Sequence, residues 1–240
     1  MSFYHPYTIF PLGDTALLID FGNEIDEAVN KKVLRLFQQL KNASISYISD
    51  LIPAYSSLTI YYDVAMVYHD KEEEKTAFET MAELVEQLSR RDQNDTTGQN
   101  RTIKIPVCYT GAYATDLDYL AKEKKITKEE AIHIHTSKTY RVYMIGFLPG
   151  FSYMGQVDPQ LAIPRKAEPQ NVKAGAVGIA GVQTGIYPLD APGGWQIIGR
   201  TPLKLFDKEK VQPVLLEPGD EIKFYSITED EFENYQTRRV

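Results

Sequence analysis

The feature that most constrains the fold is the segment 141–220, which holds 11 of the 15 glycines and 9 of the 13 prolines in the chain. Between them stand short pieces rich in Val, Ile, Tyr and Phe, such as "RVYMIGF", "AVGIAG" and "WQIIG". Proline removes a donor from a strand ladder and glycine weakens a strand interior, so long regular strands are excluded. Many short strands with Gly and Pro at their joints are typical of a barrel or a sandwich, and we predict an all-β unit here.

The amino-terminal part alternates between strand-like and helix-like patterns instead. "TALLIDF" at 15–21 predicts a strand, and apolar residues at three-and-four spacing predict helices over 25–40 and 77–88. Between the helices, "ISYISDLIPAY" and "SLTIYYDV" carry the β-branched and aromatic residues of a strand pair. We expect Asp70 with Glu73 to cap the second helix. The order strand, helix, two strands, helix predicts a small α+β sandwich.

A polar stretch separates the two parts. Residues 91–100, "RDQNDTTGQN", contain no large apolar side chain and predict a linker or an exposed loop. We therefore place an amino-terminal α/β domain over 1–92 and a barrel domain over 101–240. The second domain opens with the alternating strand "TIKIPVCY" and continues with two short helices, the second of which begins at Thr127 with capping-box spacing.

Composition and charge exclude several function classes. A net charge of −7 gives no basic surface for nucleic acid, and no apolar run is long enough to span a membrane. The amino terminus lacks the basic start and apolar core of a signal peptide. A single cysteine, Cys108, excludes an internal disulfide and fits a reducing compartment. We expect a cytoplasmic protein without a nucleic-acid or membrane partner.

The candidate motifs for metal binding, nucleophilic catalysis and phosphate binding are each incomplete or stand in an unsuitable local structure. His133 and His135 are two apart on a predicted helix, so no metal site is expected. Ser152 stands in "GFSYMG", one residue longer than a nucleophile elbow, and Cys108 fits a small buried hydrophobe. Residues 194–201 match a phosphate-binding loop except for one Arg, but "WQII" is strand-forming and Pro follows at once, so we predict a strand.

Polar side chains inside the glycine-rich segment are the remaining candidates for chemistry. One interpretation is that the glycines serve tight turns while the polar groups satisfy nearby backbone. The other is a pocket in which glycine lets the backbone approach a ligand. Residue chemistry alone leaves both open. The polar residues concerned are Arg165, Lys166, Gln183, Thr184, Tyr187 and Arg200.

Longer motifs in both parts of the chain resemble one known family. They are "PLGDTALLIDFG" and "IPAYSSLTIYYD" in the first part, and "RVYMIGFLPGFSYMG", "PRKAEP", "GAVGIAGVQTGIYPLDAPGGWQIIGRTPLKLF" and "LEPGDEIKF" in the second. These stretches closely resemble the KipI family, also called the B subunit of 5-oxoprolinase or allophanate hydrolase subunit 1. The chain departs from the family at Ser152, where Pro is frequent, at Val182, where Gly is frequent, and at Ala114 and Thr115, where a Gly-Pro pair is lost.

The resemblance implies both a fold and a function. It implies a ferredoxin-like α/β domain followed by a cyclophilin-like β-barrel, in which 141–151 would be a strand running into a bent, exposed turn at the rim of a groove. It also implies one subunit of an ATP-dependent 5-oxoprolinase that opens 5-oxo-L-proline to L-glutamate. The implied partners are a KipA-like C subunit of 5-oxoprolinase and a LamB/YcsF-type A subunit. ATP would bind in the complex, and on its own this chain would be inactive, while allophanate or another amide stays possible as substrate.

The same resemblance suggests roles for individual residues. His135 and Arg200 would be catalytic, and the substrate would contact Arg165, Lys166, Gln183, Thr184 and Tyr187. An alternative role is inhibition of the autophosphorylation of a sensor histidine kinase by direct binding, which needs an exposed apolar patch. The residues expected to bind a partner are Phe147, Leu148, Pro149, Phe151 and Tyr153. Prolyl isomerase activity would rest on fold analogy alone.

Overall fold

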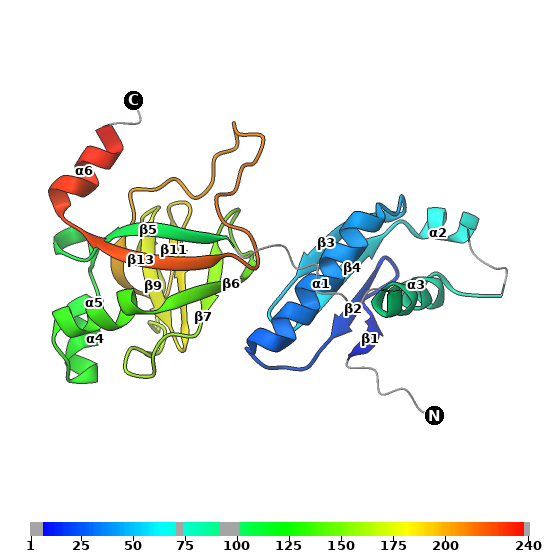
Figure 1. The fold of residues 1–240 in the computed structure, drawn as a ribbon, viewed down its shortest axis with the longest axis horizontal. Coiled ribbons are helices and arrows are strands. Elements are labelled where there is room, and N and C mark those ends of the chain that lie inside the picture. The colour runs from blue at the N-terminus through cyan, green and yellow to red at the C-terminus, as the bar shows by residue number, and fades with distance from the viewer. Residues whose placement is uncertain (1–6, 71–73, 92–100, 238–240) are drawn as a thin grey trace. The chain divides into compact units, whose positions relative to one another are not determined.

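The computed structural model describes residues 7–70, 74–91 and 101–237 (Figure 1). The chain divides into two compact units, Met1–Gln99 and Asn100–Val240. The predicted linker lies almost wholly outside the described residues. No helix in the described ranges is long and apolar enough to cross a membrane.

The amino-terminal unit is a four-stranded antiparallel sheet, in the order β1-β2-β4-β3, with α1 and α3 packed on one face. Its strands are β1 (Thr8–Pro11), β2 (Ala16–Asp20), β3 (Ile48–Pro53) and β4 (Ser57–Tyr62), and its helices are α1 (Glu27–Ala43), α2 (Val64–Asp70) and α3 (Ala77–Arg91). Alternate residues of β2 and β4 turn toward the helices and form the core with them. The predicted α+β character is confirmed, and β1 and α2 are additions to the predicted order.

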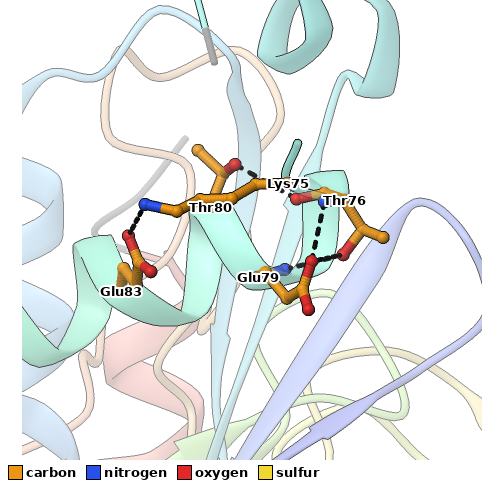
Figure 2. Close-up of polar contacts among 5 residues, drawn as sticks. All are labelled: Lys75, Thr76, Glu79, Thr80 and Glu83. Carbon is orange, nitrogen blue, oxygen red and sulfur yellow. Dashed lines mark hydrogen bonds and ion pairs between the residues drawn. The ribbon is translucent and has the colours of Figure 1, made fainter. Parts of the chain in front are cut away.

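Helix α3 begins with a reciprocal capping box. The backbone N–H of Glu79 donates to Thr76 Oγ1 at 3.2 Å, and the Thr76 N–H donates to Glu79 Oε2 at 2.8 Å (Figure 2). The predicted cap at Asp70 is therefore wrong, because Asp70 ends α2 and Thr76 occupies the capping position. Glu73, the other half of the predicted cap, lies outside the described residues.

The carboxy-terminal unit is a closed seven-stranded barrel in the order β10-β7-β6-β13-β5-β12-β9, beside a two-stranded sheet of β11 and β8 (Figure 1). The strands are β5 (Thr102–Cys108), β6 (Thr139–Ile145), β7 (Ser152–Gly155), β8 (Gln170–Val172), β9 (Ala176–Ala180), β10 (Gln183–Ile186), β11 (Ala191–Gly193), β12 (Gln196–Arg200) and β13 (Glu221–Ile227). The helical elements are η1 (Gly111–Tyr113), α4 (Leu117–Lys124), α5 (Lys128–Ser137) and α6 (Glu229–Thr237). Strands β5 and β13 pair in parallel.

The barrel follows most of the sequence-based expectations. Helices α4 and α5 form where two short helices were predicted, and α5 carries the expected capping box of Thr127 with Glu130. The phosphate-loop-like stretch is strand β12, as predicted. The unit is not purely β, since α4, α5 and α6 pack on β12, β13 and β5 respectively. Phe232 of α6 is buried in one cluster with Cys108 of β5.

The segment that joins β6 to β7 is a tight turn. The Leu148 N–H donates to the Gly146 carbonyl at 2.9 Å, and the Gly146 N–H donates to the Phe151 carbonyl at 3.1 Å. Gly150 has φ +84°, a value that costs glycine little, whereas Phe147 has φ +69°, which is uncommon for a bulky residue. The glycines and Pro149 in this apolar segment thus build a hairpin turn that presents Phe147 to solvent.

Candidate ligand pocket on the barrel wall

A pocket of about 770 Å³ opens on the outer surface of the barrel unit. It is bounded by the β6–β7 turn, by β7 and β10, and by the loops that precede β8 and β12. Its lining residues are Phe147, Phe151, Tyr153, Pro164, Arg165, Pro169, Ala180, Gly181, Val182, Gln183, Tyr187, Pro192, Gly193, Gly194 and Trp195.

Strand alternation decides which side chains reach this pocket. Along β7, Met154 joins the barrel core, so Tyr153 turns outward. Along β10, Thr184 and Ile186 are fully buried and Gln183 lines the pocket. Successive residues of one strand therefore serve the core and the pocket in turn.

The pocket wall is an aromatic cluster centred on Phe151. Its ring lies 4.7 Å from Tyr153, 5.0 Å from Tyr187 and 5.4 Å from Trp195, each in an edge-on arrangement. Edge-to-face packing at these distances is favourable and fixes the ring orientations. The wall is consequently stiff as well as apolar.

Two glycines allow this packing. A Cβ at Gly185 would lie 2.8 Å from the Ser152 carbonyl oxygen and 3.0 Å from the Trp195 ring. A Cβ at Gly193 would overlap the Tyr187 hydroxyl and lie 2.6 Å from its Cζ atom. Glycine at these places lets the backbone approach the aromatic side chains of the wall. These contacts lie within the chain, so the approach of the backbone to a ligand stays a prediction.

Arg165 brings a positive charge to the pocket. Its Nε and Nη2 atoms lie 3.6 and 3.7 Å from the position that a Cβ of Gly194 would take. Within the described part of the chain, the Arg165 guanidinium has no hydrogen bond or ion pair. Burial raises the pKa of Tyr153 and of Tyr187, and the charge of Arg165 partly opposes both shifts. Both phenols are therefore protonated near neutral pH.

Lys166, next to Arg165, does not line the pocket and instead fixes the loop. Its ammonium pairs with Asp116 Oδ2 at 2.6 Å, with only 14% and 15% of the two side chains exposed. Its backbone N–H donates to the Gly194 carbonyl at 2.7 Å. On the same loop, the Pro164 carbonyl accepts from Gln196 Nε2 at 3.1 Å. Lys166 thus holds the loop in place, and its expected contact with the substrate stays a prediction.

His135 lies inside the barrel and outside the pocket. The Thr184 hydroxyl donates to the Gly178 carbonyl at 3.0 Å, so it accepts from His135 Nε2–H at 3.3 Å. His135 Nδ1 then accepts from the Tyr109 hydroxyl at 2.8 Å. Burial lowers the pKa of His135 from 6.5 to about 3, so the imidazole is neutral. His135 and Thr184 form a buried structural chain and do not reach a ligand in this pocket.

Arg200 is also directed elsewhere. Its Nε donates to the Ala174 carbonyl at 2.8 Å, and its guanidinium lies over the Phe232 ring, 5.8 Å from the centroid. Arg200 therefore ties the loop before β9 to helix α6 and does not line the pocket. The catalytic role suggested for Arg200 has no geometric support in this unit.

The residues expected to bind a partner divide by exposure. Phe147 is 64% exposed and Pro149 is exposed, whereas Leu148 is half-buried and Phe151 is fully buried. Tyr153 is half-buried in the pocket wall. The rim therefore offers mainly Phe147 and Pro149.

Sequence reasoning missed other pocket residues. Trp195, the single tryptophan of the chain, forms the wall behind Gly193 and Gly194, and Val182 is a 44% exposed lining residue. The signal that could have found Trp195 is its place directly after Gly193 and Gly194, since glycines let the backbone approach a bulky neighbour closely. The position of Val182 depends on the tertiary fold.

The chemical repertoire of the pocket is narrow. Among the described residues that line it, none is Asp, Glu, His, Cys, Ser, Thr or Lys, and the titratable groups are Arg165, Tyr153 and Tyr187. In the described ranges, no group of three or more His, Cys, Asp or Glu side chains could hold a metal ion. The pocket can bind an anion next to an apolar ring and donate hydrogen bonds, but it offers no general base that titrates near neutral pH.

Comparison with known proteins gives consistent matches. Residues 7–216 match the family model of the carboxyltransferase domain, subdomain C and D. The B subunit of 5-oxoprolinase from Bacillus subtilis (strain 168) is 42% identical over 232 residues, 96% of this chain and 97% of that protein. The B subunit of 5-oxoprolinase from Escherichia coli O157:H7 is 36% identical over 216 residues, 89% of this chain and 93% of that protein.

A solved structure agrees with the fold. The crystal structure of TTHA0988 superposes with a TM-score of 0.76 at 34% identity, covering 88% of this chain. The match covers 40% of the TTHA0988 chain, so the present chain spans less than half of that protein.

Proposed function

The chain belongs to the KipI family of 5-oxoprolinase B subunits, and on this premise we propose that it is one subunit of an ATP-dependent hydrolase that opens the lactam of 5-oxo-L-proline to L-glutamate. The reaction adds water across a stable amide bond. It needs a nucleophile, a proton donor for the leaving nitrogen and, with ATP, activation of the lactam carbonyl.

One observation supports this proposal most directly: the described pocket residues can bind a ligand but supply no catalytic group for hydrolysis. The pocket has a free cation, Arg165, and an aromatic wall, but its described lining residues include no base or nucleophile for amide hydrolysis. Such a surface fits one half of an active site that is completed by another protein of the complex. We assign the second half to a KipA-like C subunit, with a LamB/YcsF-type A subunit as a further member of the complex.

The length of the TTHA0988 chain supports a partner protein that binds directly next to this chain. In that protein a unit like this one is covalently joined to a remainder that makes up more than half of the chain. A separate protein can take the place of such a remainder when the two chains bind each other tightly. The exposed rim residues Phe147 and Val182 are suited to this contact, because both are large apolar groups beside the pocket mouth.

ATP fits the partner better than this pocket. Triphosphates are ordinarily held by several backbone N–H groups at a helix start, by cations and by Mg²⁺. The described lining residues supply one cation, Arg165, and no helix begins at the pocket. We therefore assign nucleotide binding to another member of the complex and the contacts of Gln183 and Tyr187 to the organic substrate.

The test is reconstitution from separate proteins. The chain is co-purified with the C-type and A-type subunits, and ATP-dependent release of glutamate from 5-oxo-L-proline is measured for each protein and for the mixture. We expect glutamate from the mixture and none from this chain alone. Turnover by this chain alone would contradict the shared site. A stable complex without turnover would overturn 5-oxo-L-proline as the substrate and leave either another amide substrate or a binding role, such as inhibition of a sensor histidine kinase.

A further inference from the structure

We propose that this chain, and not its partner, recognises the substrate: Arg165 binds the carboxylate of a small cyclic acid while the aromatic wall of Tyr153 and Trp195 packs against the ring. The identity of the acid as 5-oxo-L-proline rests on the proposed function. The contacts of the pocket residues support the assignment of substrate binding to this chain and of the chemistry to the partner.

The choice of Arg165 over its neighbour follows from their contacts. Lys166 is held by Asp116 at 2.6 Å and also donates to Gln170 Oε1 at 2.9 Å. Arg165 lines the pocket and has neither an acidic partner nor a hydrogen-bond acceptor among the described residues. A guanidinium offers paired donors that match a carboxylate in a bidentate arrangement. Of the two adjacent cations, Arg165 alone is available to an anion.

The loop that carries Arg165 is fixed before any ligand arrives. Three contacts hold this loop. The Lys166 N–H donates to the Gly194 carbonyl, and the Lys166 ammonium pairs with Asp116. The Pro164 carbonyl accepts from Gln196. The backbone is thereby tied to the start of β12 and to the amino-terminal end of α4. A binding group on a fixed loop loses less conformational freedom when the ligand binds.

The aromatic wall sets the other half of the specificity. Tyr153 and Trp195 lie 5.9 Å apart at an interplanar angle of 64°, and both meet Phe151 edge-on. A compact neutral ring gains contact with these faces. A charged ring nitrogen would lose hydration there and be repelled by Arg165, which opposes its cation–π attraction to the rings. A lactam nitrogen is neutral, so a cyclic amide acid suits this wall better than a cyclic amino acid.

The pocket has room for more than the substrate. Pockets of roughly 300–1,000 Å³ enclose drug-sized molecules, and 5-oxo-L-proline is much smaller than these. The present pocket measures about 770 Å³. The space that remains beside a bound substrate is where groups of the partner enter to act on the lactam carbonyl.

The first test compares two ligands of nearly the same size and shape in the reconstituted complex: 5-oxo-L-proline, which carries a carboxylate, and its neutral carboxamide. We expect Arg165→Gln to raise KM for 5-oxo-L-proline by about 10- to 100-fold, the range for one lost hydrogen bond to a charged group, with a smaller change in kcat. Inhibition by the carboxamide should be unchanged, and Arg165→Lys should recover part of the affinity. The matched control is Lys128→Gln, which removes a cation from an exposed ion pair with Asp118.

The second test uses the single tryptophan of the full chain. Because Trp195 lines the pocket, its fluorescence should change saturably with 5-oxo-L-proline, and Arg165→Gln should abolish this change at the same ligand concentrations. An active complex in which Arg165→Gln alters neither KM nor ligand preference would overturn the inference and leave the proposed function intact. Carboxylate-dependent binding without turnover in the complex would overturn the proposed function and leave this inference intact.

Discussion

Replacing Phe147 with glycine and with alanine tests whether the β6–β7 turn stores backbone strain. The residue has φ +69°, in the left-handed region, and its ring meets Phe151 edge-on at 5.7 Å. Both variants lose this ring contact, worth about 0.5–1.5 kcal/mol, so it cancels when the two are compared with each other. The difference in the free energy of unfolding between the two variants therefore reports the backbone contribution alone.

The expected difference can be worked from two opposing terms. A left-handed backbone costs an L-residue about 1–2 kcal/mol and costs glycine almost nothing. Glycine in turn loses about 0.5–1 kcal/mol more conformational freedom than alanine on folding. We therefore expect Phe147→Gly to be more stable than Phe147→Ala by about 0.75 kcal/mol, the difference between the midpoints of the two ranges, which reverses the order in regular structure.

Urea unfolding followed by the fluorescence of Trp195 measures this difference. Trp195 is the single tryptophan and lies in the barrel unit, so the signal reports the unit that contains the turn. An alanine variant as stable as the glycine variant, or more so, would refute the strain argument. Both variants should lose affinity for the C-type partner equally, because the exposed ring is absent from each. Strain of this kind persists where the displayed side chain has a function.

Three further predictions concern the support of the pocket. His135 has a folded pKa of about 3 against 6.5 unfolded, so its contribution to stability is complete above pH 6.5 and is lost as the pH falls toward 3, by about 5 kcal/mol in all. His135→Gln should therefore flatten the pH dependence of the free energy of unfolding measured in urea. An unchanged pH dependence would contradict the burial of His135 as a neutral group. Gly193→Ala should lower the free energy of unfolding by about 1–3 kcal/mol through overlap with Tyr187, as measured in urea, and a neutral effect would contradict the close approach. Lys166→Met and Asp116→Asn should be non-additive in a double-mutant cycle by about 0.5–2 kcal/mol, whereas additive effects would remove the ion pair as the anchor of the loop.

The parts of the fold that the sequence predicted are those whose signal is local. The three-and-four spacing in α1 and α3 and the capping box at Thr127 describe one helix at a time, and the structure has all three. The missed elements depend on distant partners. Strand β1 has four residues, one of them Pro11, and is a strand because it pairs with β2. Helix α6 packs on the barrel with Phe232, the one buried residue among 229–235, in a stretch whose first three residues are acidic.

The candidate site divides between adjacent residues in a way that sequence alone could not resolve. Gln183 faces the pocket and Thr184 faces the barrel core, because neighbours on a strand point to opposite sides and the register with β7 decides which side is outside. Arg165 and Lys166 differ for another reason. Asp116, which is distant in the sequence, forms an ion pair with Lys166, and Arg165 has no such partner among the described residues. In each pair the residue outside the pocket is fixed by contacts of its own and so helps to position the neighbour that lines the pocket. Substitutions at Thr184 or Lys166 should therefore lower activity through stability or loop position, and only those at Gln183 or Arg165 should change which ligand is preferred.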